Sequence, residues 1–291
     1  MSCRPHIRQS GFTLIEAIVV MVITGILAAI VAVFITKPVE GYADAVRRAE
    51  LTDVADVALR RMSREVRMAL PNSLRVSGSG ECVEFIMTSA GGRYRDVGDG
   101  STGAILSFTS TSVLTFDVLG TMPSNPEIAA GDYIAVYNLG EGYNPANAYN
   151  YDSATLTEAC RLGGCNVAKV ASAPVGNTVT LTANPFAAAS PPLPSPEARF
   201  QVIPGGTKAV SYECAGGQLR RYSNYDLTTA QSCPPSGTGA VLAGDATTTA
   251  LCPTLNYAAS GRNGLLVVKL DLSAGGESVS LFQQIRVDNA P

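Results

Sequence analysis

An apolar run from Phe12 to Thr36 constrains the fold of this chain more than any other feature. It is long enough to span a bilayer as one helix. Arg4 and Arg8 precede it, so the positive-inside rule places the first residues in the cytoplasm and everything after the run outside. The run holds a single charged residue, Glu16. A carboxylate at the centre of a membrane helix costs about 2.5 kcal/mol or more, so the sequence predicts that another group pairs with it.

The small residue that could mark a processing site lies before the apolar run. Ordinary secretory signals are cut after their apolar region, whereas Gly11 precedes it. Cleavage after Gly11 would leave the run on the mature chain, which would then begin with the free amine of Phe12. A plain membrane anchor explains the length and orientation of the run, but neither Glu16 nor the position of Gly11.

Composition excludes several classes of function. A net charge of −3 argues against a nucleic-acid surface. The one histidine, His6, lies in the leader, so a processed chain could form neither a Ser-His-Asp triad nor a histidine-ligated metal site. We therefore expect a protein that is not an enzyme and has no required cofactor.

The cysteines after the leader form an even set, which in an exported chain indicates disulfides rather than a zinc site. They are Cys82, Cys160, Cys165, Cys214, Cys233 and Cys252. Cys160 and Cys165 enclose two glycines that permit a tight turn. For the other four we prefer Cys214–Cys252 with Cys82–Cys233, and the alternative is Cys214–Cys233 with Cys82–Cys252.

Beyond the apolar run, residues 37–70 have the spacing of an amphipathic helix that continues the first one. Pro38 should kink it near the membrane surface, and Pro71 should end it. The expected apolar face is Val39, Ala43, Val46, Val54, Val57, Met62, Val66 and Ala69, and Glu65 falls on the charged face. This apolar face requires a sheet to cover it.

Residues 71–291 have the short β-type runs and dense turn signals of a β-rich head. The expected strands are Cys82–Met87, Ile105–Phe108, Val113–Val118, Tyr133–Tyr137, Val167–Val170, Thr178–Leu181, Arg199–Ile203, Ala209–Glu213, Gln218–Tyr222, Leu251–Tyr257, Leu265–Leu272 and Ser278–Val287. Alternation is clearest in the last two, which predict an antiparallel hairpin with one buried face. The fold class is therefore α+β: a long N-terminal helix packed on an antiparallel sheet.

Two loop segments could bind a ligand. Arg95–Gly100 contains Asp96 and Asp99 and looks like a fragment of a calcium loop, with Asp117 also near loops, but it lacks the later ligands of an EF-hand. The segment 137–152 holds Tyr137, Tyr143, Tyr149 and Tyr151 among asparagines. It suits protein or sugar binding if exposed, although a packed surface loop is the more common case.

The motif Gly11-Phe12-Thr13-Leu14-Ile15-Glu16 before a long apolar helix resembles the class III signal of type IV prepilins and type II secretion pseudopilins. The resemblance implies cleavage between Gly11 and Phe12 by a prepilin peptidase and N-methylation of Phe12. It also implies that Glu16 meets the N-terminal amine of a neighbouring subunit. A private role, in which Glu16 caps its own helix, is the alternative.

Further stretches are similar to MshO-type minor pilins of MSHA pilus biogenesis systems, a group that also resembles the J-type pseudopilins. They include Ala69–Ser73, Gly91–Arg95, Arg199–Ile203, Val210–Cys214, Leu219–Tyr222 and Gln284–Pro291. The pilin motif covers only the start of the chain. The domains that we expect are a leader (1–11), a transmembrane helix (12–36), its amphipathic continuation (37–70) and the head (71–291).

The resulting hypothesis is a minor pilin in the initiating tip complex of a type IV pilus. It would sit in the inner membrane with its head in the periplasm, and then join the fibre through contacts with other major and minor pilins. Alternatives are a minor pseudopilin of a type II secretion system, or a tip adhesin that binds a surface ligand.

Overall fold

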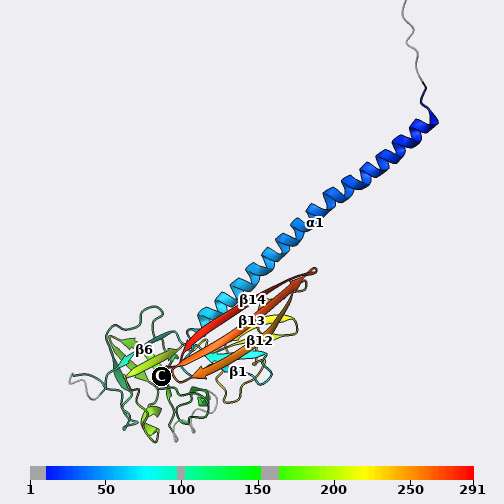
Figure 1. The fold of residues 1–291 in the computed structure, drawn as a ribbon. Helices are drawn as coiled ribbons and strands as arrows, with labels where there is room; N and C mark the ends of the chain where they lie inside the picture. Colours follow the sequence, from blue (N-terminus) through cyan, green and yellow to red (C-terminus); the bar gives the residue numbers. More distant parts are fainter. Residues whose placement is uncertain (1–10, 97–101, 152–163) are drawn as a thin grey trace, which may run out of the picture. The chain divides into compact units, whose positions relative to one another are not determined.

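The computed structural model describes residues 11–96, 102–151 and 164–291. It divides into two compact units, Met1–Glu50 and Leu51–Pro291. One helix, α1 (Leu14–Val66), begins in the first unit and ends in the second, with Pro38 inside it. The second unit, the head, combines this helical end with antiparallel strands (Figure 1). The predicted α+β class is confirmed.

The predicted helix extends too far at its C-terminal end, because strand-like pairing replaces helical bonding before Leu70. Helix α1 stops at Val66, and Ala69 forms an isolated antiparallel bridge with Met87. The Leu70 N–H donates to the carbonyl of Ile86 at 2.8 Å.

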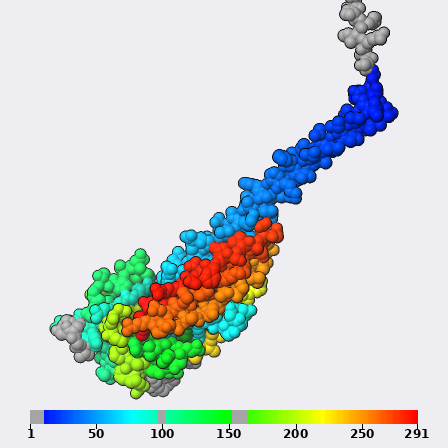
Figure 2. All heavy atoms as spheres, in the orientation of Figure 1, coloured from blue at the N-terminus to red at the C-terminus, as the bar shows by residue number. Residues whose placement is uncertain are grey.

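Two antiparallel sheets share one core with the end of α1. The first sheet has the order β1 (Arg75–Val76), β2 (Cys82–Ile86), β9 (Ala209–Ala215), β10 (Gln218–Ser223) and β11 (Ala240–Ala243). The second has the order β12 (Thr249–Ser260), β13 (Asn263–Ala274) and β14 (Glu277–Asp288). Figure 2 shows β13 and β14 running along one surface of the head.

The buried stripe of α1 differs from the predicted one. Val54 and Val57 are 42% and 67% exposed, so their place on the apolar face was wrong. The residues that meet the sheets are Leu51, Ala55, Ala58, Leu59, Met62 and Val66. They pack against Val83, Phe85, Val210 and Tyr212 of the first sheet and Leu266, Val268, Leu270, Leu272, Ile285 and Val287 of the second. Small alanines in the stripe let the helix approach the strands closely.

The last predicted hairpin is confirmed. The even-numbered residues from Leu266 to Leu272 are buried, and Gly275-Gly276 turns the chain into β14. Both glycines have positive φ, 56° and 87°, which is the backbone of a two-residue hairpin turn that glycine adopts without strain.

A closed six-stranded barrel is inserted between β2 and β9, and the sequence did not predict it. In ring order its strands are β3 (Ala90–Tyr94), β4 (Thr115–Leu119), β7 (Thr178–Leu181), β6 (Val167–Val175), β5 (Tyr133–Ala135) and β8 (Arg199–Ile203). Short 3-10 turns, η1 (Ala148–Asn150) and η2 (Pro185–Ala188), lie in its connections. Ile86 pairs directly with Ala209, so the sheet closes beneath the insertion.

Two barrel segments depart from the strand predictions. Strand β3 was missed because it contains Gly91-Gly92, yet a Cβ on Gly92 would lie 2.8 Å from the Phe200 ring, so glycine permits the close pairing with β8. Ile105–Phe108 was predicted as a strand and is not one. Leu106 there is apolar because it fills the barrel core.

Candidate assembly site

The predicted processing site lies on exposed backbone outside any helix or strand. Gly11, Phe12 and Thr13 precede the helix, and the Phe12 side chain is 71% exposed. Leader residues 1–10, with Cys3 and His6, lie outside the described residues. Cleavage between Gly11 and Phe12 stays a prediction.

Thr13, and not Glu16, caps the start of α1. The Thr13 Oγ1 accepts a hydrogen bond from the Glu16 N–H at 3.3 Å, and the Thr13 carbonyl accepts one from the Ala17 N–H at 3.1 Å. Threonine is a favourable N-cap for this reason. Within the part of the chain that the structure describes, the Glu16 carboxylate has no hydrogen-bond partner. It is exposed and free to meet a group from another chain.

The apolar run surrounds Glu16 with side chains that need a non-aqueous environment. Among the described residues, α1 is the one helix long and apolar enough to cross a membrane, and none of its most apolar window is buried. Ile18, Met21, Ile26, Ile30 and Phe34 are all more than 45% exposed. Lipid or the helices of other subunits would have to cover this surface, which leaves Glu16 as the charged group in the covered region.

At the other end of α1, Glu65 ties the helix to the first sheet. It was predicted on the charged face, but its side chain is 10% exposed. Its Oε2 accepts hydrogen bonds from Arg221 Nε of β10 and the Tyr212 hydroxyl of β9, both at 2.7 Å. Its Oε1 accepts from Arg61 Nε, one turn earlier, at 3.2 Å. Sequence analysis missed this site because Arg221 is remote along the chain.

Ionisation of Glu65 should stabilise the head. Burial alone would raise the pKa of Glu65. The hydrogen bonds from Arg221, Tyr212 and Arg61, together with the positive charge of Arg221, outweigh burial and lower that pKa below its ordinary value of 4.5. Because the folded-state pKa is depressed, this stabilisation is complete above about pH 4.5 and is lost as the pH falls through the folded-state pKa.

We expect the stability advantage of the wild type over Glu65→Gln to shrink on acidification. At pH 7 the wild type should unfold at a higher urea concentration than the variant, because only the ionised carboxylate holds Arg221 as an ion pair. The two midpoints should converge as the pH falls below 4.5 and through the folded-state pKa of Glu65. Urea titrations of both full chains in detergent at each pH measure this, and a gap that is independent of pH would contradict it.

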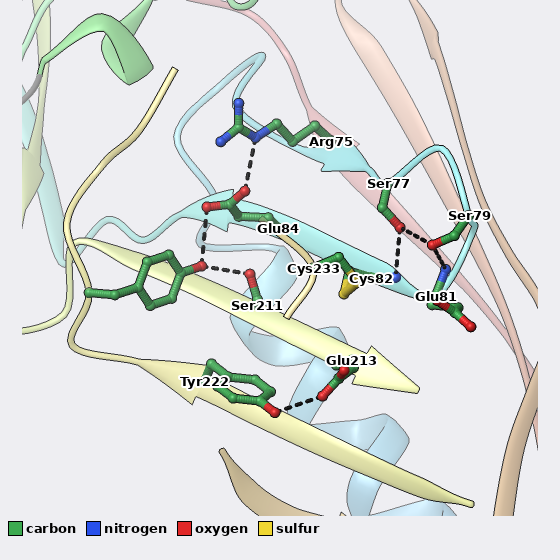
Figure 3. Close-up of a disulfide and its surroundings, with 11 residues drawn as sticks. Arg75, Ser77, Ser79, Glu81, Cys82, Glu84, Ser211, Glu213, Tyr222 and Cys233 are labelled. Carbon is green, nitrogen blue, oxygen red and sulfur yellow. Dashed lines mark hydrogen bonds and ion pairs between the residues drawn. A yellow bond between two sulfur atoms is a disulfide. The ribbon is translucent and has the colours of Figure 1, made fainter. Parts of the chain in front are cut away.

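A second buried ion pair lies in the first sheet (Figure 3). The Arg75 Nε donates to Glu84 Oε2 at 2.9 Å, and the two side chains are 9% and 2% exposed. The Tyr225 hydroxyl donates to Glu84 Oε1 at 3.2 Å and lies 2.6 Å from the Ser211 hydroxyl. Burial raises the pKa of Glu84 despite the neighbouring Arg75. The Arg75 guanidinium also stacks 3.7 Å from the centre of the Tyr149 ring.

Among the described residues, two disulfides cross-link the head. They link Cys82 to Cys233 and Cys214 to Cys252, the pairings preferred from sequence, so the alternative Cys214–Cys233 with Cys82–Cys252 does not occur. The predicted Cys160–Cys165 pair involves Cys160, which lies outside the described residues.

Part of the tyrosine-rich segment is packed into the head. Tyr149 and Tyr151 are 2% and 4% exposed. The packed case, which the sequence favoured, holds for these two residues, whereas Tyr143 is 60% exposed.

The calcium prediction rests partly on Asp99, which lies outside the described residues. Asp117 accepts a hydrogen bond from the Thr178 hydroxyl at 2.7 Å and lies 3.6 Å from Arg95 Nε. Within the described ranges, no group of three His, Cys, Asp or Glu side chains could hold a metal ion. Calcium binding by this chain stays a prediction.

Comparison with known proteins identifies the N-terminal segment. Residues 7–32 match the prokaryotic N-terminal methylation motif, the class III signal of type IV pilins. No curated protein and no solved structure is significantly similar to the chain. The matched range contains the Gly11–Phe12 junction, Glu16 and most of the exposed apolar run. This motif is typical of type IV pilin and pseudopilin subunits, and the exposed apolar helix fits a membrane anchor.

Proposed function

We propose that the chain is a minor pilin of the MshO type, a non-enzymatic subunit of the initiating tip complex of a type IV pilus. The observation that carries this proposal is Glu16, whose carboxylate has no partner among the described residues and which lies in an exposed apolar helix, one helical turn after the Gly11–Phe12 junction. Prepilin peptidase would cut this junction, and Phe12 would then carry the new N-terminal amine.

The chemistry of the two groups explains assembly. An ammonium and a carboxylate that enter an apolar environment together offset each other's desolvation, whereas either group alone is strongly unfavourable there. The Phe12 amine of one subunit and Glu16 of its neighbour would thus set the register between helices. Before assembly, Arg4 and Arg8 would hold the leader in the cytoplasm and place the head in the periplasm.

The inserted barrel favours the role of a minor subunit over that of the major subunit, which repeats along the fibre. The helix–sheet core closes through the direct pairing of β2 with β9, so the inserted barrel is not needed to cover α1. It adds head surface between these two strands. Such surface suits contacts with different subunits at the end of a fibre.

We expect Glu16→Val to be processed normally but to enter fibres at least about tenfold less, since the Phe12 amine of a neighbouring subunit would then enter the apolar environment without a carboxylate to pair with (tenfold being about 1.4 kcal/mol). The measurement is mass spectrometry of the mature N-terminus together with the amount of tagged chain in sheared fibres. Glu40→Val is the matched control, because Glu40 is exposed on the same helix beyond the apolar run.

Normal incorporation of the Glu16 variant would contradict the pairing mechanism, and a mature N-terminus other than methylated Phe12 would contradict the processing. Immunogold labelling locates the subunit: gold at fibre ends supports a tip subunit, whereas gold along the shaft excludes it. If deleting the gene abolishes protein secretion and leaves pili intact, the chain is a pseudopilin.

A further inference from the structure

A polar cavity of about 470 Å³ lies in the head, and its lining residues belong to the strands and loops of the head rather than to α1. Its walls are the turn Gly205–Lys208 between β8 and β9, the loop Asn224–Gly237 after β10, and Glu84 of β2. Pockets that bind small molecules fall between about 300 and 1,000 Å³. The cavity is therefore large enough for one small ligand.

The loop that forms one wall is fixed in place. The Cys82–Cys233 disulfide ties it to β2, as Figure 3 shows. The two Arg75 terminal nitrogens donate to the carbonyls of Thr229 and Thr228 at 2.8 and 2.9 Å. These attachments hold the cavity open before any ligand binds, which lowers the entropy lost on binding.

The charged groups at the cavity are already paired with each other. Glu84 is held by Arg75, and Lys208 Nζ donates to Asp226 Oδ1. A charged ligand would find no unpaired countercharge among these groups and would disrupt an existing pair. The electrostatics therefore favour a neutral ligand.

Several polar groups at the cavity can still form hydrogen bonds with a ligand. Asn224, Ser232 and Ser236 line it, are exposed, and have no hydrogen-bond partner within the described residues. Both oxygens of Glu84 accept one bond each, and a carboxylate has further acceptor capacity. We propose that this cavity binds a small neutral ligand rich in hydroxyl groups, of the size and chemistry of a hexose. The inference concerns the head alone and does not rest on the pilin assignment.

The test is a saturation-transfer NMR titration of the full chain in dodecylphosphocholine, a detergent without a sugar headgroup. The probes are D-glucose, D-galactose and N-acetyl-D-glucosamine with their methyl glycosides, and D-glucosamine and D-glucuronate as charged analogues. We expect at least one neutral sugar to bind, and more tightly than both charged analogues. Binding of the methyl glycoside indicates the end of a glycan chain, and binding of the reducing sugar alone indicates a free sugar; either supports the site.

Two variants test whether the sugar binds in this cavity. Ser236→Trp should fill it and weaken binding by about tenfold or more (about 1.4 kcal/mol for tenfold), whereas Ser278→Trp, on the exposed face of β14, should bind as the wild type does. Asn224→Gly removes one amide without backbone strain, because Asn224 has a φ of 67° that glycine adopts freely. It should also bind more weakly at an unchanged melting temperature, and it decides the matter if Ser236→Trp does not fold.

Three results overturn the proposal. The first is that none of the three neutral sugars binds the wild type. The second is that a charged analogue binds more tightly than all of them. The third is that the folded Ser236→Trp or Asn224→Gly chain binds a sugar as tightly as the wild type.

Discussion

Replacing Glu65 with alanine should lower the free energy of unfolding of the head by about 3–5 kcal/mol, the range for breaking one partner of a buried ion pair. The loss is large because Arg221 and the Tyr212 hydroxyl would both lose their acceptor inside the helix–sheet contact, where Arg221 is 12% exposed. Denaturant unfolding of the full chain in detergent, followed by the near-ultraviolet circular dichroism of its tyrosines, measures the change.

The matched control is Glu50→Ala, which removes an exposed glutamate from the same helix and should change stability by less than about 0.5 kcal/mol, as surface substitutions do. A double variant, Glu65→Gln with Arg221→Met, removes both charges and should recover part of the loss. If Glu65→Ala costs no more than Glu50→Ala, the ion pair does not fasten the helix to the sheet.

Removing the Cys82–Cys233 disulfide should destabilise the head more than removing Cys214–Cys252. The two bonds close loops of 151 and 38 residues. In the chain-entropy description of the unfolded state the longer loop contributes about 1.2 kcal/mol more, on top of a typical 2–4 kcal/mol per disulfide. The Cys82→Ser/Cys233→Ser chain should thus unfold at a lower denaturant concentration than the Cys214→Ser/Cys252→Ser chain.

Both double variants keep the remaining disulfides, so non-reducing unfolding curves compare them directly. The same order of stability should disappear in reductant, because neither bond then restrains the unfolded chain. A larger loss for the Cys214–Cys252 pair would show that strand-end geometry, and not loop length, sets the contribution of these bonds.

Local pattern was sufficient for the parts of the chain whose partners are near in sequence. Alternation from Leu265 to Leu272 predicted the final hairpin, because burial of every second residue is a property of one strand. The apolar run with Glu16 likewise predicted an anchoring helix, since length and composition alone decide whether a helix can span a bilayer.

The helix face and its polar anchor depended on contacts that spacing does not contain. Both Val57 and Glu65 lie on one amphipathic helix, yet the valine is exposed and the glutamate is buried. Arg221 and Tyr212 of a distant hairpin supply the partners that make burial of the carboxylate favourable. Periodicity reports average polarity around a helix, and it does not reveal where a sheet will place a guanidinium.

The sequence by itself determined that this chain carries an apolar helix long enough to span a membrane, with one carboxylate near its start, followed by a disulfide-linked β-rich head. Only the tertiary structure decided that the head is a helix–sheet core with a closed barrel inserted between β2 and β9, and that a polar cavity lies beside Glu84. The physical reason is the separation along the chain over which each interaction acts. Apolar length and alternation act between near neighbours, whereas barrel closure, buried ion pairs and cavity walls join residues that lie far apart in the chain.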